Sequence, residues 1–328
     1  MRQFEYIRPA DVNDAVRILS GGGKLLAGGT TLYDLMKLRI ERPARIVDIN
    51  HLSDLKHYDS SGDHELVFGA LARMSDVAAD RRIIRDYPAI SESLWRAASQ
   101  QLRNMASLGG NLLQRTRCHY FRGGDPYACN KRDPGSGCAA IEGLDRGQAV
   151  LGASRACSAV YPGDLAAALI IFDAEIDVIG SGGERMIPLE ELHREPGDTP
   201  HIETTLKPDE IIVRIRVPTT PLGRASTYLK VRDRESYAFA LASAAVALQM
   251  DGDIVLGARV ALGGLATRPW RARAAERLLI GRRFDEAAAR AAGEAAVEGA
   301  KPGRSSGFRI ELGARTVADA LMIARQRT

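Results

Sequence analysis

The order of short elements in the first fifty residues is the feature that most constrains the fold. Hydrophobic periodicity, cap residues and glycines predict a strand at 4–7, a helix at 12–19 capped by Asp11, a strand at 24–27, a helix at 33–39 and a strand at 45–49. This β-α-β-α-β order favours parallel strands joined by crossover helices. The chain is therefore expected to begin with a small α/β lobe.

A longer mixed unit follows, and a short Pro-rich segment ends it. Strands are predicted at 66–70, 175–179 and 211–217. One helix is predicted to begin after Ser75 as its cap, a further helix at 90–98, and another at 165–171 after Asp164 as its cap. Residues 218–223, with two prolines and a glycine, are typical of a linker. Beyond them we expect a strand at 226–231, a buried helix or strand in the apolar run 238–250, strands around Gly252 and a helical tail.

The predicted fold class is α+β in two domains. The first covers 1–220, with lobes at 1–55 and 56–220, and the second, smaller α+β domain covers 224–328. A length of 328 residues with 45% hydrophobic and 26% charged residues is typical of an ordinary folded protein. No internal repeat is found.

Charge and hydropathy narrow the possible partners. The net charge of +4 is mild and no block of Lys and Arg occurs, so no nucleic acid is expected as a partner. No apolar run approaches ~20 residues, so no membrane insertion is expected. No apolar segment follows the N-terminal Arg2, which predicts no secretory signal and a cytoplasmic protein unless a partner carries it across a membrane.

Two segments with paired glycines have the composition of anion-binding loops. In the first, Gly28 and Gly29 precede two threonines and a predicted helix, and in the second, Gly109 and Gly110 lie between a serine and Asn111. Backbone N–H groups at such turns can bind a phosphate. Neither segment is a Walker loop or a Gly-x-Gly-x-x-Gly motif, and each could be a simple turn. Together they favour one large phosphate-bearing ligand between two lobes.

All four cysteines lie in one 40-residue window that is rich in Gly, Arg and Pro. Their spacing is C-x10-C-x8-C-x18-C, from Cys118 through Cys129 and Cys138 to Cys157. The paired C-x2–4-C knuckles of structural zinc sites are missing, and a [4Fe–4S] cluster accepts such wider spacing. Nearby Arg117, Lys131 and Arg132 add positive charge. The spacing alone leaves a cluster, zinc and inert or disulfide-paired thiols open.

Neither a His-rich zinc motif nor a Gly-x-Ser-x-Gly elbow occurs, so a hydrolase has no support in the sequence. The segments 27–32 and 107–112 instead resemble the two flavin-binding signatures of the FAD subunits of molybdenum hydroxylases. The resemblance covers nearly the whole chain. It implies a two-lobed FAD domain of the p-cresol-methylhydroxylase type, followed by that family's smaller C-terminal domain.

The cysteine window resembles one branch of this family more specifically. Residues 111–122 and 129–140 are similar to the FAD subunits of bacterial periplasmic aldehyde oxidoreductases, which carry a [4Fe–4S] insertion, here at about 115–160. The resemblance implies Cys118, Cys129, Cys138 and Cys157 as the cluster ligands. The 4-hydroxybenzoyl-CoA reductase subunit has a comparable insertion with less similar flanks.

The resemblance also implies a set of FAD-binding residues and no catalytic residue on this chain. The pyrophosphate would be held by Leu25, Leu26, Ala27, Gly28, Gly29, Thr30, Thr31 and Leu32, and the second side lined by Ala98, Ser107, Gly110 and Asn111. Asp164 would bind near the ribose or adenine, and Ile212 would pack on the adenine or ring system. Lys230 would approach the isoalloxazine, and Tyr237 would cover one edge of it. Ala97 stands where xanthine dehydrogenases carry an aromatic residue stacked on the flavin.

These resemblances imply a redox subunit of a heterotrimeric, molybdenum-dependent aldehyde oxidoreductase. Electrons would pass from a large molybdenum-cofactor subunit through [2Fe–2S] clusters on a small subunit to FAD here, and on to an external acceptor such as a ferredoxin, a quinone or oxygen. The large and small subunits would form a heterotrimer or a dimer of heterotrimers with this chain, exported to the periplasm on a signal borne by the small subunit, or kept in the cytoplasm. The alternatives are a subunit of a 4-hydroxybenzoyl-CoA reductase-like enzyme and a zinc-stabilised nucleotide-binding module without a redox role.

Overall fold

The computed structural model describes all residues from 1 to 328 and contains three β-sheets. The first sheet belongs to the N-terminal lobe, where three parallel strands lie in the order β1-β3-β2. The elements of this lobe are β1 (Glu5–Ile7), α1 (Val12–Ser20), β2 (Lys24–Leu26), α2 (Leu32–Lys37) and β3 (Arg45–Asp48). Asp11 caps α1 by accepting from the backbone N–H of Asp14 at 2.8 Å. The predicted parallel α/β lobe is therefore confirmed.

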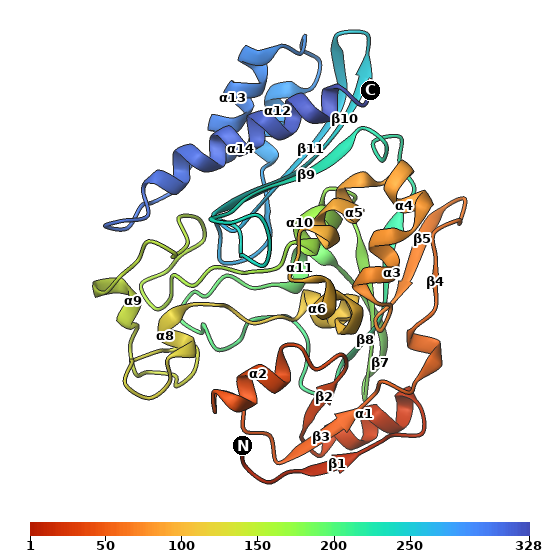
Figure 1. Cartoon of the computed structure of the whole chain (residues 1–328), viewed down its shortest axis with the longest axis vertical. Coiled ribbons are helices and arrows are strands. Elements are labelled where there is room, and N and C mark those ends of the chain that lie inside the picture. Colours follow the sequence, from red (N-terminus) through yellow and green to blue (C-terminus); the bar gives the residue numbers. More distant parts are fainter.

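The second sheet has five strands in the order β4-β5-β8-β6-β7, and every pair in it is antiparallel. Helices pack on it (Figure 1) and bury a core of 38 residues. The first elements of this unit are η1 (Ser53–Leu55), β4 (Tyr58–Asp59), β5 (Glu65–Gly69), α3 (Met74–Ala79), α4 (Arg81–Asp86), α5 (Pro88–Trp95), α6 (Gln100–Met105) and α7 (Leu108–Leu112). The later ones are α10 (Leu165–Ile170), β6 (Glu175–Gly180), β7 (Gly183–Pro188), α11 (Leu189–Leu192) and β8 (Ile211–Pro218).

One cap predicted from the sequence is wrong, and a second is right in position but makes no capping hydrogen bond. Arg73, and not Ser75, occupies the N-cap position of α3, and Ser75 lies in the first helical turn. Asp164 does occupy the N-cap position of α10, but its carboxylate accepts no helix N–H. It is held instead by the side chains of Tyr228 and Lys230 from a distant strand.

The cysteine segment projects from this unit and has little regular structure. Its two short helices, α8 (His119–Arg122) and α9 (Ala139–Glu142), lie between α2 and the C-terminal helices (Figure 1). Cys129 and Cys138 form an isolated antiparallel bridge through their backbones.

The third sheet is antiparallel, in the order β12-β11-β10-β9, and three helices cover one of its faces (Figure 1). Its elements are β9 (Ser226–Val231), β10 (Ala242–Asp251), β11 (Ile254–Gly263), β12 (Trp270–Arg271), α12 (Arg273–Leu279), α13 (Glu286–Ala296) and α14 (Phe308–Arg325). The apolar run 238–250 thus forms a strand and not a helix. Ala245 and Ala247 join the core of the preceding unit, whereas Val246 and Leu248 join the core under the C-terminal helices. A strand buried on both faces reads as a continuous apolar run.

None of the helices has the length and apolar character that would let it cross a membrane.

Candidate functional site

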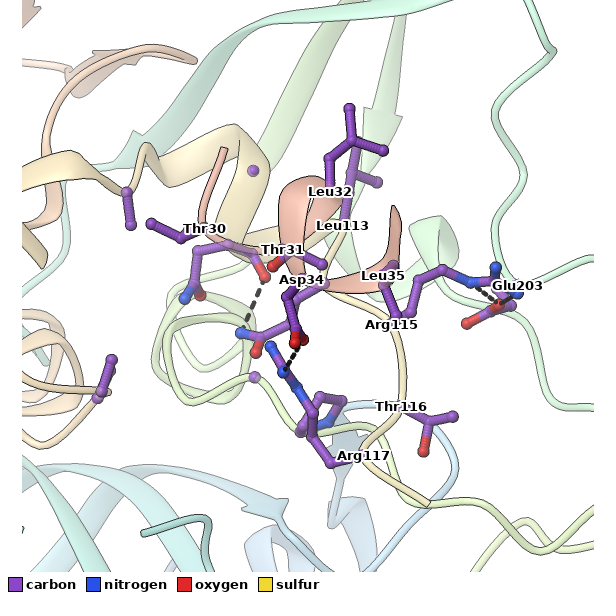
Figure 2. Close-up of a pocket in the computed structure, with 18 of the residues that line it drawn as sticks. Thr30, Thr31, Leu32, Asp34, Leu35, Leu113, Arg115, Thr116, Arg117 and Glu203 are labelled. Atoms are coloured by element: carbon purple, nitrogen blue, oxygen red, sulfur yellow. Dashed lines mark hydrogen bonds and ion pairs between the residues drawn. The ribbon is translucent and has the colours of Figure 1, made fainter. Parts of the chain in front are cut away.

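A cavity of about 1940 Å³ lies where the N-terminal lobe, the cysteine segment and the third sheet meet. All the FAD-binding residues expected from the sequence line it except Leu26. The structure thus brings together the two paired-glycine loops, Asp164, Ile212, Lys230 and Tyr237. Figure 2 shows part of its wall, including Thr30, Thr31 and Leu32 at the start of α2.

The first paired-glycine loop is pressed against the end of α6, just before the second loop. A Cβ on Gly28 would lie 1.9 Å from the backbone oxygen of Met105, so only glycine fits at this position. Gly29 has a positive φ of 74°, which glycine adopts without strain. At the end of the loop, Thr31 makes no capping hydrogen bond to α2. The loop therefore presents backbone N–H groups and hydroxyls to the cavity.

The second loop is fixed by a cap and leaves one buried acceptor without a partner. Ser107 caps α7 by accepting from the backbone N–H of Gly110 at 3.2 Å. The side-chain nitrogen of Asn111 reaches the sulfur of Met74 at 3.5 Å, while its Oδ1 is buried and unpartnered. Buried polar atoms are normally satisfied. An acceptor left open beside a cavity fits a ligand that supplies the missing donor.

A buried charged pair forms another part of the wall. Lys230 Nζ lies 2.8 Å from a carboxylate oxygen of Asp164, and it also donates to the backbone oxygen of Arg96 at 3.0 Å. The hydroxyl of Tyr228 donates to the other carboxylate oxygen. Burial, together with the charge of Asp164, raises the pKa of Tyr228 well above its usual range, so this phenol stays protonated.

Tyr237 lies at an exposed edge of the cavity in a strained backbone conformation. Its φ is +54°, and its side chain is 56% exposed. Arg234 Nε donates to the backbone oxygen of Tyr237 at 3.1 Å, and the guanidinium lies 5.6 Å from the centre of the ring. Positive φ values in non-glycine residues cluster at ligand-binding sites. The ring is thus held at the cavity edge and is not buried in a core.

The four cysteines are free thiols, and only Cys118 lines the cavity. Cys129 and Cys157 are buried, and the other two are partly buried. Burial is the main cause that raises the pKa of Cys157 to about 11; Lys131 opposes this rise, and the neighbouring Cys138 and Cys118 add to it. Burial also raises the pKa of Cys118, against N–H donors that include Gln148, whose Nε2 lies 3.5 Å from the sulfur.

The surroundings of these thiols fit a sulfur-bound group only in part. N–H donors to sulfur, here also from Ala159 at 3.4 Å to Cys157, are a feature of iron–sulfur sites. No three or more His, Cys, Asp or Glu side chains are arranged to hold a metal ion, however. Arg132, expected to add charge there, donates to the backbone oxygens of Tyr120, Phe121 and Gly124, which hold its guanidinium in place without neutralising it. The structure thus supplies the donor chemistry but no assembled ligand set.

Two comparisons of the sequence decide the family. Residues 2–220 match the FAD binding domain in molybdopterin dehydrogenase, and residues 227–323 match the CO dehydrogenase flavoprotein C-terminal domain. The chain is 45% identical to the aldehyde oxidoreductase FAD-binding subunit PaoB of Escherichia coli, over 99% of both chains. The chain belongs to the FAD-binding medium subunits of the molybdenum hydroxylases. It is therefore a subunit of an oxidoreductase, and its cavity belongs to an FAD-binding domain.

More distant medium subunits share the fold. The carbon monoxide dehydrogenase medium chain of Hydrogenophaga pseudoflava is 26% identical over 92% of this chain and 88% of its own. The crystallised carbon monoxide dehydrogenase of that organism matches with a TM-score of 0.77 over 99% of this chain and 98% of the matched one. Quinoline 2-oxidoreductase from Pseudomonas putida 86, at 24% identity and a TM-score of 0.75, shows the same fold over 99% and 98%. The expected fold class, an FAD-binding domain plus a smaller C-terminal domain, is confirmed.

In this medium subunit, sequence reasoning missed the acidic partners of three arginines beside the cysteines. Arg117 and Arg122 pair with Asp34 of α2, at 3.2 and 2.7 Å. Arg115 bridges Glu41 of the N-terminal lobe at 2.7 Å and Glu203 at 2.5 Å. Figure 2 shows Arg117 facing Asp34, and Arg115 facing Glu203. These pairs join the cysteine segment to the lobe across the cavity, and isolated acidic residues carry no sequence signal for such contacts.

Proposed function

We propose that this medium subunit binds FAD in the 1940 Å³ cavity and passes electrons from a molybdenum-dependent aldehyde oxidation to an external acceptor. The observation that carries the proposal is the convergence of both paired-glycine loops and Lys230 on one cavity in a chain 45% identical to an aldehyde oxidoreductase subunit. When bound, FAD converts a two-electron oxidation into steps that other carriers can accept. The chain itself binds the FAD, orients it and tunes its redox potential.

Different residues of the cavity suit different parts of the FAD, according to their chemistry. The N–H groups and hydroxyls from Gly28 to Thr31 suit a pyrophosphate, because they offer donors and no negative charge. The free Oδ1 of Asn111 can accept from an N–H or O–H of the ligand. Lys230, held in place by Asp164, offers a fixed cation to the isoalloxazine. Ala98, Ile212 and Tyr237 provide further parts of the wall.

The cysteine segment is proposed to hold a [4Fe–4S] cluster through Cys118, Cys129, Cys138 and Cys157. Two observations support this: all four thiols are free, and backbone N–H groups approach the sulfurs of Cys118 and Cys157. Metal binding and local ordering are coupled in small metal-binding segments. We therefore expect these loops to rearrange into a ligand set when iron and sulfide are supplied.

The partners are proposed from the chain's relatives. PaoB is named as a subunit of an aldehyde oxidoreductase, and the carbon monoxide dehydrogenase matches are named as medium chains. We propose a large molybdenum-cofactor subunit and a small [2Fe–2S] subunit as partners, and a ferredoxin, quinone or oxygen as the acceptor. Periplasmic location by co-export with a signal-bearing partner is also proposed, and fractionation of cells that express the whole complex tests it.

The membership in an oxidoreductase family weighs against a zinc-stabilised module without a redox role. The deciding experiment measures flavin, iron, sulfide and zinc on the same sample of the chain, purified without oxygen. About one FAD and about four iron per chain, with a flavin band near ~450 nm, is the expected result. A colourless protein that contains zinc and takes up no added FAD would refute the proposal. FAD without iron would refute the cluster alone.

A second measurement tests the direction of electron flow in the assembled complex. With the partners present, an aromatic or aliphatic aldehyde should bleach the flavin band, whereas the isolated chain with FAD should not respond to aldehyde. Bleaching by aldehyde in the isolated chain would contradict the assignment of substrate oxidation to a partner.

A further inference from the structure

Arg309, near the start of α14, is a buried cation with no acidic partner. The residue is 2% exposed. Its Nη1 donates to the backbone oxygen of Gln148 at 3.1 Å, and its Nη2 donates to the backbone oxygens of Leu241, at 2.9 Å, and Gly264. Its Nε is buried without a partner. Backbone oxygens accept from both terminal nitrogens of the guanidinium, but they leave its Nε without a partner and its charge uncompensated.

Three other cations are buried: Lys230 and Arg271 are paired with acids, while Arg103 also lacks an acidic partner but does not line the cavity. Lys230 is paired with Asp164 at 2.8 Å. Arg271, in the same domain, is paired with Glu276 and with Asp173. A buried charge is costly unless it is paired or serves a ligand. Burial and the nearby Arg146 lower the pKa of Arg309 to about 10, which still leaves it charged at neutral pH.

Arg309 also lines the cavity that the FAD-binding residues share. It lies at the Lys230 side, because Leu241, which accepts from its Nη2, donates its own N–H to Val231, the residue after Lys230. Gly264, the other acceptor of Nη2, lines the same cavity. The first paired-glycine loop, suited to the pyrophosphate, belongs instead to the N-terminal lobe.

We propose that Arg309 is the uncompensated positive charge that stabilises the anionic, reduced form of FAD in this subunit. This inference rests on the proposed function. Oxidised FAD takes up two electrons, delivered from the substrate oxidation, and one proton from solvent, and so gains one unit of negative charge. A fixed cation beside the cavity lowers the free energy of that state relative to the oxidised one. In this proposal Arg309 acts through its charge alone and transfers no proton.

The test is the midpoint potential of the bound flavin, measured by anaerobic reductive titration with a reference dye. The purified complex is compared with its Arg309→Gln and Arg309→Met variants, which remove the charge, and with Arg309→Lys, which keeps it. Because the potential reports the ratio of the affinities for reduced and oxidised FAD, it separates tuning from binding. A tenfold change in the ratio of the two affinities corresponds to about 30 mV for a two-electron couple.

We expect a potential about 30 mV more negative in Arg309→Gln or Arg309→Met, a potential near the wild-type value in Arg309→Lys, and a dissociation constant for oxidised FAD within about threefold of wild type. Arg271→Gln is the matched control: it removes a buried arginine of the same domain that does not line the cavity. This control should lower stability and leave the potential unchanged. The Arg309 variants would give the same result if the role of Arg309 were purely structural.

Three outcomes would overturn the inference. The potential could be unchanged in variants that retain FAD, which leaves the proposed function standing. The affinity for oxidised FAD could fall with no change in potential, which would assign the charge to the pyrophosphate. The control could shift the potential as much as Arg309→Gln does, which would make the effect one of stability. A wild-type chain that binds no FAD would refute the proposed function itself and is detected before any variant is compared.

Discussion

Lys230 and Asp164 form an ion pair that joins the two domains at the wall of the cavity. Asp164 precedes α10 in the FAD-binding domain, and Lys230 lies on β9 after the linker. The two charged atoms are 2.8 Å apart, and the side chains are 1% and 7% exposed. Breaking a buried pair by removing one partner is far more costly than replacing both.

We therefore expect Asp164→Asn to lower the free energy of unfolding of the FAD-free chain by about 3 kcal/mol, as measured by urea unfolding. The double variant Asp164→Asn, Lys230→Met should recover most of this loss, because no unpaired charge remains, but should still bind FAD at least about tenfold more weakly. Losses in stability that simply add would contradict the coupling of the two side chains.

Gly28→Ala should disrupt the contact between the first paired-glycine loop and the end of α6. The new Cβ would lie 1.9 Å from the backbone oxygen of Met105, and backbone cannot rotate away as a side chain can. We expect a loss of about 2 kcal/mol in stability and a clear drop in FAD affinity by fluorescence titration. Gly147→Ala is the control, since its Cβ would meet nothing within 4 Å, and its melting temperature should match wild type. Equal melting temperatures for both variants would refute the close packing of Gly28 against the end of α6.

His193 predicts how stability depends on pH. Burial lowers its pKa to about 4, although its Nε2 donates to the backbone oxygen of Leu112 at 2.8 Å. Between pH 4 and about 6.5 the unfolded chain therefore binds a proton that the folded chain does not. Stability should rise with pH across this window and be lost as the pH falls toward 4, by up to roughly 3 kcal/mol.

The His193→Gln variant should show a flatter pH profile of the unfolding free energy over the same window. His64, an exposed histidine, serves as the control, and His64→Gln should keep the wild-type slope. If the slope of His193→Gln equals that of wild type, the neutral buried histidine is not the source of the pH dependence.

Cys138→Ser should remove the iron while FAD stays largely bound, because Cys138 does not line the cavity. Iron counted per chain should fall from about four to below one, and the flavin band should remain. Asp125→Asn changes an exposed residue of the same segment and should leave both unchanged. Full iron content in Cys138→Ser would remove this cysteine from the proposed ligand set.

The parts of the fold that the sequence predicts are those with local signals. The Asp11 cap was predictable because the free N–H groups of α1 lie within three residues of its carboxylate. The Asp164 cap failed because Tyr228 and Lys230, more than sixty residues away, hold that carboxylate. The run 238–250 gave no period, since β10 is buried on both faces. Its conformation depends on the two hydrophobic cores that pack on its faces, and their positions cannot be read from the sequence.

In the candidate site too, features with a local sequence signal were predictable, and contacts between distant segments were not. Paired glycines mark the two loops in the sequence because close backbone approach and a positive φ require that residue. Arg115 and its partners Glu41 and Glu203, or Arg309 and its backbone acceptors, could not be anticipated. Each depends on segments brought together by the tertiary fold, and arginines and glutamates are common on any surface.

The order of strands in the five-stranded sheet has a consequence for how the chain folds during synthesis. β8, the last of its strands in sequence, lies between β5 and β6. The sheet cannot close until about residue 218 has left the ribosome, whereas the N-terminal lobe needs only its first fifty residues. Non-local pairing of this kind is slow. The four thiols, which lie between β5 and β6 in the chain, thus stay on an unclosed loop until β8 inserts.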